Sequence, residues 1–283
     1  MGTSSRYGGP TTGNPLIPSW LEPSGPVAAP AQGQPADEQP RSVNQPQSQP
    51  VAPQPGVVQQ HPHFQASRVS LNKAARTGDR SYVRRAAGTY VSRGTGGSRS
   101  ASGRMAVPKR TAGRLIGFVN DVRDRGFAAA ARDFGLGDLA GQPVADAVAS
   151  LMEAFCPAGG GIDEAIAREA WNETLLEAVE EGVVDFSALT PQQWAVLVQE
   201  FIAHSIEARM IADIGAETFS EATTVDRINE IQSELRDLIS GAVRAALGPL
   251  TGNNRRISTA ECAQLADRIY TQSFVYLEAL EAE

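Results

Sequence analysis

A glycine-rich basic stretch has the residue types needed to bind an anion. It runs GTGGSRSASGR from Gly94 to Arg104 and combines unobstructed backbone N–H groups with arginine forks, which suit a phosphate. The G-x-x-x-x-G-K-[ST] spacing of a P-loop is absent. Two interpretations therefore remain open. The stretch is either an anion-binding site that is not a P-loop or a flexible basic loop.

Arginines and tyrosines alternate just before this stretch, in DRSYVRRAAGTYVSR from Asp79 to Arg93. Such a composition can clamp phosphates and stack bases, but it also suits docking onto a partner protein. The apolar positions approach a helical repeat that Gly88 interrupts, so we expect a short helix that forms on contact. The candidate residues of the basic segment are Arg84, Arg85, Tyr90, Arg93, Gly94, Gly96, Gly97, Arg99 and Arg104.

Groups that could perform catalysis are scarce. The helical part has one histidine, His204, whose neighbours one turn away are Glu200 and Ala208, and we expect it to be a packing or surface residue. Carboxylates such as Glu177 are expected on solvated faces. Serine hydrolase, zincin, Rossmann and deaminase motifs are absent from the sequence. This favours a binding protein over an enzyme and predicts no cofactor.

The two cysteines, Cys156 and Cys262, lie far apart and belong to no CxxC or Cys/His cluster, which predicts small core residues and no metal site. The opening MGTSSRYGGP lacks the apolar core of a signal peptide, and the sequence has no run of eighteen apolar residues. We therefore expect a cytoplasmic protein.

A compact apolar patch near the N-terminus, around Leu16 and Trp20, is typical of a linear binding motif. Pro15 and Pro18 hold it extended, which suits a groove on a partner. The alternative is that Trp20 packs on the chain's own helices. The residues predicted to be recognised are Thr3, Ser4, Tyr7, Gly8, Gly9, Pro10, Pro15, Leu16, Pro18 and Trp20.

Amino-acid composition divides the chain into regions, and these regions must position the candidate binding residues. Thirteen of the eighteen prolines fall within residues 1–67, where too little apolar surface is available to offset the entropy of ordering. We expect a linear motif at 1–23, a Pro/Gln-rich disordered linker at 24–67, a basic Gly/Arg-rich segment at 68–110 and an acidic helical domain at 111–283. The fold class is thus all-α, a C-terminal bundle of about six helices after a long, largely disordered arm.

Charge follows the same division. Residues 68–110 carry eleven basic side chains against Asp79 alone, whereas residues 111–283 carry twelve against twenty-eight acidic ones, a net charge of −16. Opposite charges on one chain permit the basic segment to fold back onto its own domain. The firmest local signals in that domain are two capping boxes, Thr190 with Gln193 and Ser258 with Glu261.

The opening MGTSSRYGGPTTGNPLIPSW, the later RRAAGTYVSRGTGGSRSASGRM and the helical C-terminal region together resemble the QatB family, a component of four-gene Qat antiphage defence systems. The resemblance implies a non-catalytic adaptor or effector-coupling subunit. It also implies three partners from the same operon, namely a QueC-like enzyme, a KAP-type P-loop ATPase and a TatD-like nuclease.

The resemblance further implies a modified N-terminus. By analogy with a related antiviral QueC-like enzyme, a 7-deazapurine nucleobase would be joined to Gly2. Removal of Met1 would expose an unhindered α-amine, and its pKa near about 8 leaves a neutral fraction that can act as a nucleophile. N-myristoylation needs Ser or Thr at position 6, where this chain has Arg6. An unmodified glycine is the remaining alternative, and binding of nucleic acid by segment 68–110 is the alternative function.

Overall fold

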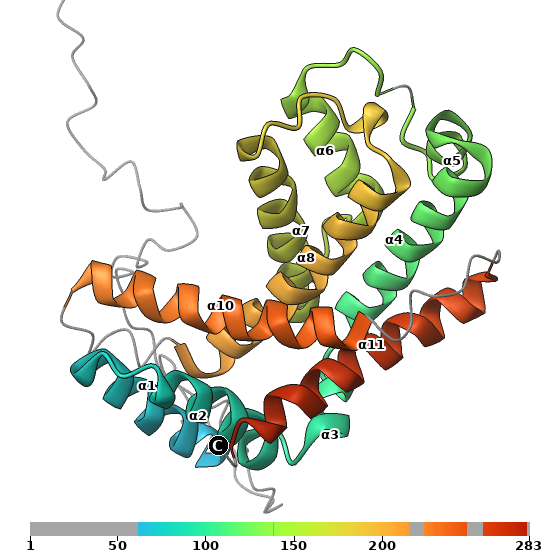
Figure 1. Cartoon of the computed structure of the whole chain (residues 1–283). Coiled ribbons are helices and arrows are strands. Elements are labelled where there is room, and N and C mark those ends of the chain that lie inside the picture. Colours follow the sequence, from blue (N-terminus) through green and yellow to red (C-terminus); the bar gives the residue numbers. More distant parts are fainter. Residues whose placement is uncertain (1–61, 138, 216–223, 248–256, 282–283) are drawn as a thin grey trace, which may run out of the picture. The chain divides into compact units, whose positions relative to one another are not determined.

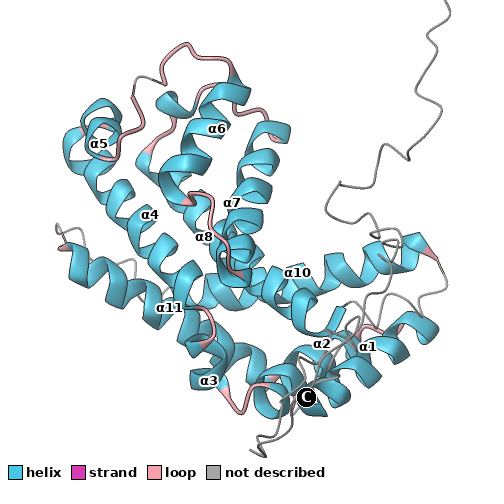
Figure 2. Cartoon of the chain, turned by 180° about the vertical axis from the view of Figure 1, so that it is seen from behind, coloured by secondary structure: helices cyan, strands magenta, loops and turns pink. Residues whose placement is uncertain are grey.

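The regular structure in the described part of the chain is entirely helical (Figure 1; Figure 2). The computed structural model describes residues 62–137, 139–215, 224–247 and 257–281, all within one compact unit, Val58–Glu283. The predicted all-α class is therefore confirmed. The predicted linear motif at 1–23 and the linker up to residue 61 lie outside the described residues.

Ten α-helices fall within the described ranges, together with short 3-10 and π-helical turns. The helices are α1 (Gln65–Thr77), α2 (Ser81–Thr89), α3 (Ser98–Gly103), α4 (Ala106–Arg125), α5 (Phe127–Asp133), α6 (Val144–Phe155), α7 (Ile162–Glu180), α8 (Pro191–Met210), α10 (Val225–Leu247) and α11 (Thr259–Ala279). The π-helical turns are Tyr90–Gly94 after α2 and Ile211–Gly215 after α8. Pro62–Phe64 and Phe186–Ala188 form 3-10 turns.

The helices form two groups with a pair of long helices between them. Helices α4 to α8 make up one group, and α1 to α3 make up the other (Figure 1). Helix α10 contacts both α8 and α2, and α11 contacts both α4 and α3, so α10 and α11 join the groups, as the view from behind also shows (Figure 2).

Both predicted capping boxes are present. The Gln193 amide N–H donates to Thr190 Oγ1 at 3.2 Å, and the Thr190 N–H donates to Gln193 Oε1 at 2.9 Å. Ser258 and Glu261 make the equivalent pair of bonds at the start of α11. Each box satisfies two backbone donors that a helix N-terminus leaves without partners, so these starts were predictable from sequence.

Helix α4 includes Pro108 in its first turn and ends before Phe127. Helix α4 starts at Ala106, because a proline in the first turn replaces an N–H that has no partner within the helix. It ends at Gly126, whose φ of 81° breaks the helix and separates α4 from α5. With α5 counted, residues 111–283 contain more helical segments than the six expected.

The core is centred on aromatic side chains of α4, α6, α7 and α8. Phe118 packs against Trp194 with ring centroids 4.9 Å apart and against Phe155 at 5.4 Å. Trp171, from α7, meets Phe155 at 5.8 Å and Phe201 at 6.0 Å. All five rings are fully buried. Cys156 and Cys262 are buried free thiols, as predicted, and burial raises the pKa of Cys156 to about 11.

Residues 63–110 pack into the same core. Phe64, Leu71, Val83 and Tyr90 are buried in one continuous cluster with the residues of α4 to α11. The boundary expected at residue 111 therefore falls inside α4 and does not follow the packing. The last few residues expected to belong to the linker, from Pro62 to Ser67, form a 3-10 turn and the first turn of α1.

Candidate functional site

The predicted site residues divide into two sets. Gly2 and the residues expected to be recognised by a partner, from Thr3 to Trp20, lie outside the described residues. The basic segment is described throughout and is helical. Its geometry can therefore be compared with the anion or nucleic-acid site expected from the sequence.

Gly88 allows the basic segment to pack against the last helix. A Cβ at this position would lie 2.4 Å from the backbone N of Glu281. The residue lies inside α2 and is buried, so it does not interrupt the helix as the sequence suggested. The reason is close backbone approach, which offsets the low helix propensity of glycine.

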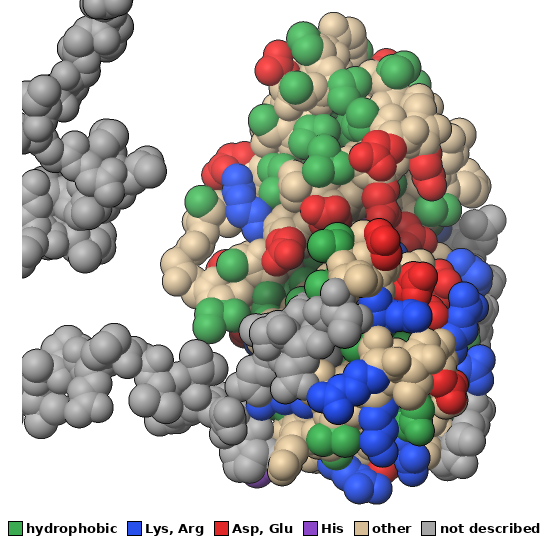
Figure 3. Space-filling model, turned by 90° about the vertical axis from the view of Figure 1, so that its left-hand side faces the viewer, with side chains coloured by type: hydrophobic (Ala, Val, Ile, Leu, Met, Phe, Trp, Pro, Cys, Tyr) green, Lys and Arg blue, Asp and Glu red, His purple; other side chains and the backbone are tan. Residues whose placement is uncertain are grey.

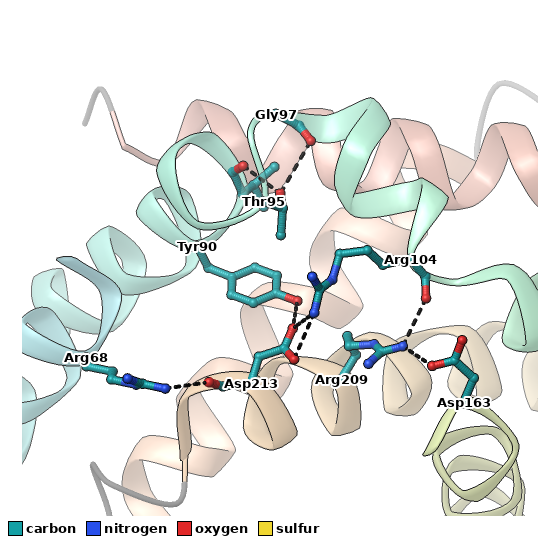
Figure 4. Close-up of polar contacts among 9 residues, drawn as sticks. Arg68, Tyr90, Thr95, Gly97, Arg104, Asp163, Arg209 and Asp213 are labelled. Atoms are coloured by element: carbon teal, nitrogen blue, oxygen red, sulfur yellow. Dashed lines mark hydrogen bonds and ion pairs between the residues drawn. The ribbon is translucent and has the colours of Figure 1, made fainter. Parts of the chain in front are cut away.

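Asp213 is the centre of a polar cluster that holds the basic segment in place (Figure 4). Its carboxylate accepts a hydrogen bond from Tyr90 Oη at 2.8 Å. Arg104 Nη2 lies 3.0 Å from Oδ1 and 2.8 Å from Oδ2 of the same carboxylate. Arg68 Nη2 donates to the Asp213 backbone carbonyl at 3.0 Å. Three residues of the basic segment thus converge on one acidic residue of the π-helical turn after α8.

Tyr90 is part of this interior and does not face a ligand. The side chain is 1% exposed and stacks on Phe64 with centroids 5.3 Å apart. Burial, and then the neighbouring charge of Asp213, raises the pKa of Tyr90 well above its ordinary value, so the phenol remains a neutral donor. The expectation that Tyr90 stacks on bases or contacts an anion from outside is therefore wrong, because the core needs an apolar ring there.

A second arginine extends the cluster to α7. Arg209 Nη2 donates to the backbone carbonyl of Arg104 at 3.0 Å and also pairs with Asp163 (Figure 4). The cluster thus links the π-helical turn after α2, helix α7 and the end of α8 with the short turn after α3. Its members are Tyr90, Arg104, Asp163, Arg209 and Asp213. Neither Asp213 nor Asp163 stood out in the sequence as a partner of the basic segment.

The glycine-rich turn has the shape expected of it, but its partner is internal. Gly96 and Gly97 take φ values of 82° and 106°, which favour glycine. The Ser98 N–H, the donor expected for a phosphate, lies 3.2 Å from Glu278 Oε2. Arg93 pairs with Glu281 at 2.6 Å, and Ser92 donates to the same carboxylate. Carboxylates of Glu278 in the last helix and of Glu281 after it thus bind the donors at this turn.

Ion pairs between the basic segment and the acidic domain recur elsewhere. Arg80 lies 2.9 Å from Glu234 of α10, and Lys109 lies 2.6 Å from Asp267 of α11. The fold-back that the charge division permits is therefore realised in the structure. The outer side of the segment remains basic, because the side chains of Arg84, Arg85 and Arg99 are exposed.

A buried group around His204 was not foreseen. His204 is 3% exposed, and its Nε2 lies 2.9 Å from Glu177 Oε2, while its Nδ1 lies 3.8 Å from Glu207 Oε2. Arg236 closes a ring, with Nη1 at 2.6 Å from Glu177 and Nε at 2.9 Å from Glu207. Glu177 is half-buried in this ring, so the expectation that it lies on a solvated face is wrong.

Burial is the main influence on the pKa of Glu207 in this ring. It raises the pKa of Glu207, and the neighbouring Arg236 only partly opposes the effect. The four side chains come from α7, α8 and α10, and each one is committed to the others. The i to i+3 spacing of His204 and Glu207 was the one sequence pattern that could have indicated this ring. No sequence pattern indicated that Glu177 of α7 and Arg236 of α10 belong to it.

The described residues include no group of three or more histidine, cysteine, aspartate and glutamate side chains arranged to hold a metal ion. None of the helices in the described ranges is both long enough and apolar enough to cross a membrane.

Comparison with known families places the chain. Residues 96–277 match the family model described as Qat anti-phage system associated protein QatB. The match begins in the glycine-rich turn and ends within α11, so it covers α3 to α10 and most of α11. It leaves out α1, α2 and the opening residues on which the resemblance partly rested. No curated protein and no solved structure matches the chain. Because the model covers more than half of the residues, the chain belongs to the QatB family and takes part in Qat anti-phage defence.

Proposed function

We propose that the protein is a non-catalytic adaptor, or effector-coupling subunit, of the Qat system. Family membership is the observation that carries this proposal. The ionisable groups of the described interior add support, since His204, Glu177, Glu207 and Arg236 are bound to one another. A general base or nucleophile needs a free approach to a substrate, and His204 is instead enclosed by its own helices. The adaptor would act in the cytoplasm.

The N-terminal arm is the proposed functional centre. Gly2 would accept a 7-deazapurine group. The QueC-like enzyme of the same operon would activate the carboxylate of the base with ATP, and the neutral α-amine of Gly2 would attack the activated carbonyl carbon. The amide C–N bond would form as the bond to the activating group breaks, and the amine would lose a proton. The small size of Gly2 and the ordinary pKa of about 8 for an α-amine support this role. The enzyme would recognise the segment from Thr3 to Trp20. The KAP-type ATPase and the TatD-like nuclease are the other proposed partners.

The arrangement of the chain supports separate roles for arm and domain. The described helices begin at residue 62 and pack into a single core. We expect residues 1–61, whose composition predicts a largely disordered arm, to present the terminus to the enzyme while the domain binds elsewhere.

Intact-mass and N-terminal peptide mass spectrometry test the proposal. The full chain is expressed alone and together with the QueC-like enzyme of its operon. We expect a nucleobase-sized mass gain on the Gly2 peptide only in the second case. Gly2→Leu, which keeps Met1 in place, should abolish the gain, whereas Gly25→Leu in the linker should not. An unmodified Gly2 under both conditions would rule out the acceptor role.

A further inference from the structure

The hairpin of α1 and α2 presents a strongly basic outer face. Residues 65–89 contain six basic side chains and a single acidic one, Asp79. The apolar side, with Leu71 and Val83, is buried in the core. The opposite side exposes Lys73, Arg76, Arg80, Arg84 and Arg85. The hairpin is thus amphipathic, and the charged side chains on its exposed side are almost all positive.

The structure separates these outward cations from the inward ones. Arg68 and Arg104 are committed to Asp213, and Lys109 is committed to Asp267. Arg80 pairs with Glu234 but keeps 81% of its side chain exposed, so a second anion can still reach it. The one acidic group of the hairpin, Asp79, accepts a hydrogen bond from the Ser81 N–H at 2.9 Å and so serves the turn.

One of the outward cations reaches across from α1 to α2. Lys73 of α1 has its Nζ 5.5 Å from the centre of the Tyr82 ring of α2. Lysine and arginine side chains gather over the lower part of the face shown in Figure 3, whereas acidic side chains predominate above them. At physiological salt the Debye length is about 8 Å, so acidic side chains farther than this from the hairpin repel a polyanion there only weakly.

The chemistry of the face favours a phosphate backbone over an acidic protein. Protein interfaces usually have an apolar centre with aromatic anchors. From His63 to Arg110, Val69 is the one exposed large apolar side chain among the described residues, at 48%. The Tyr82 ring is half-buried and lies under Lys73. Four of the five outward cations are arginines, whose planar forks match phosphate oxygens.

We infer that the outer face of the α1–α2 hairpin binds the phosphate backbone of nucleic acid without reading its sequence. The site keeps Arg84 and Arg85 of the predicted basic segment but not Tyr90, Arg104 or the glycine-rich turn, which are occupied internally. It involves neither Gly2 nor the arm before residue 62. Its success or failure is therefore independent of the proposed modification.

Salt-dependent binding of the full chain to DNA tests the inference. Fluorescence anisotropy would follow a labelled short duplex, and a single strand of the same sequence, between about 50 and 200 mM salt. With about five phosphate contacts, each contributing about −0.9 to the slope of log affinity against log salt, duplex affinity should fall about 500-fold over that range. Changing the duplex sequence should leave the affinity unchanged.

A charge-neutralising variant and a matched control locate the face. The variant changes Arg76, Arg84 and Arg85 to Gln. It should bind more weakly and lose only about 12-fold in affinity over the same salt range, because about two contacts remain. The control alters net charge equally on exposed positions of α5, α10 and α11, by changing Arg132, Arg244 and Arg268 to Gln. It should behave as the unaltered protein does.

Three outcomes would overturn the inference. One is absence of DNA binding at about 50 mM salt, where backbone contacts are strong. Another is equal weakening by the variant and the control, provided that circular dichroism shows both to be folded. The third is binding to polyglutamate but not to DNA, which would assign the face to an acidic protein partner.

Discussion

Replacing Asp213 by alanine removes the acceptor that holds the basic segment to α8. Tyr90 Oη and Arg104 Nη2 both donate to this carboxylate, at 2.8 Å in each case. The tyrosine is 1% exposed, so its hydroxyl would be left in the interior without its acceptor. We expect Asp213→Ala to weaken the packing of helices α1, α2 and α3 against the other helices more than it weakens any other part of the protein.

The magnitude follows from the burial of the two donors. A buried hydroxyl left without a partner costs about 1–3 kcal/mol. The Arg104 side chain is 39% exposed, so the loss of its ion pair is screened by solvent and adds only about 0–1 kcal/mol. The free energy of unfolding should therefore fall by about 1–4 kcal/mol.

Urea denaturation followed by far-UV circular dichroism measures this loss. Asp267→Ala is the matched control, because it removes the carboxylate that pairs with Lys109 at 2.6 Å but is itself 60% exposed. That variant should lose at most about 1 kcal/mol. In Asp213→Ala, hydrogen exchange should accelerate first in helices α1, α2 and α3, since the bonds from Tyr90 and Arg104 to the turn after α8 are lost.

A double-mutant cycle with Tyr90→Phe tests the cause of the loss. Removing the hydroxyl as well as the carboxylate leaves no unsatisfied donor on the ring, so the two losses should be less than additive by about 1 kcal/mol or more. Additive losses, or an Asp213→Ala variant as stable as Asp267→Ala, would contradict the role assigned to the Tyr90–Asp213 hydrogen bond.

Three further predictions concern other parts of the chain. Burial raises the folded-state pKa of Glu207 above 4.5, so ionisation of this carboxyl destabilises the folded state as pH rises from about 4.5 through the folded pKa. In urea titrations across that pH window, Glu207→Gln should become progressively more stable relative to the unaltered protein. A constant difference between the two would contradict this. Gly88→Ala would bring a Cβ within 2.4 Å of the Glu281 backbone and should cost about 1–3 kcal/mol in thermal melts, whereas Gly103→Ala, which meets nothing within 4 Å, should not destabilise. Deleting residues 1–22 should abolish phage defence in a plaque assay while circular dichroism shows the helices intact; retained defence would refute the proposed role of the arm.

The sequence by itself determined the features that depend on near neighbours. The capping boxes at Thr190 and Ser258 join residues three positions apart, and helical repeats of apolar residues likewise depend on short spacings. The division of charge was also apparent from composition, and it anticipated the pairing of the basic segment with the acidic domain. Family membership could be inferred from motifs, although the matching region begins only at Gly96.

Only the tertiary structure decided the hydrogen-bond and ion-pair partners of two sets of polar residues, those of the basic segment and those of the His204 ring. Tyr90 and Asp213 are 123 positions apart, and Glu177 and Arg236 are 59 apart. Nothing in a local pattern specifies such pairs, because they depend on how α8 and α10 pack against distant helices. The physical reason is that burial makes a lone charge or hydroxyl costly. The fold therefore matches the inward polar groups, Arg68 among them, to one another and leaves the other cations of α1 and α2 exposed.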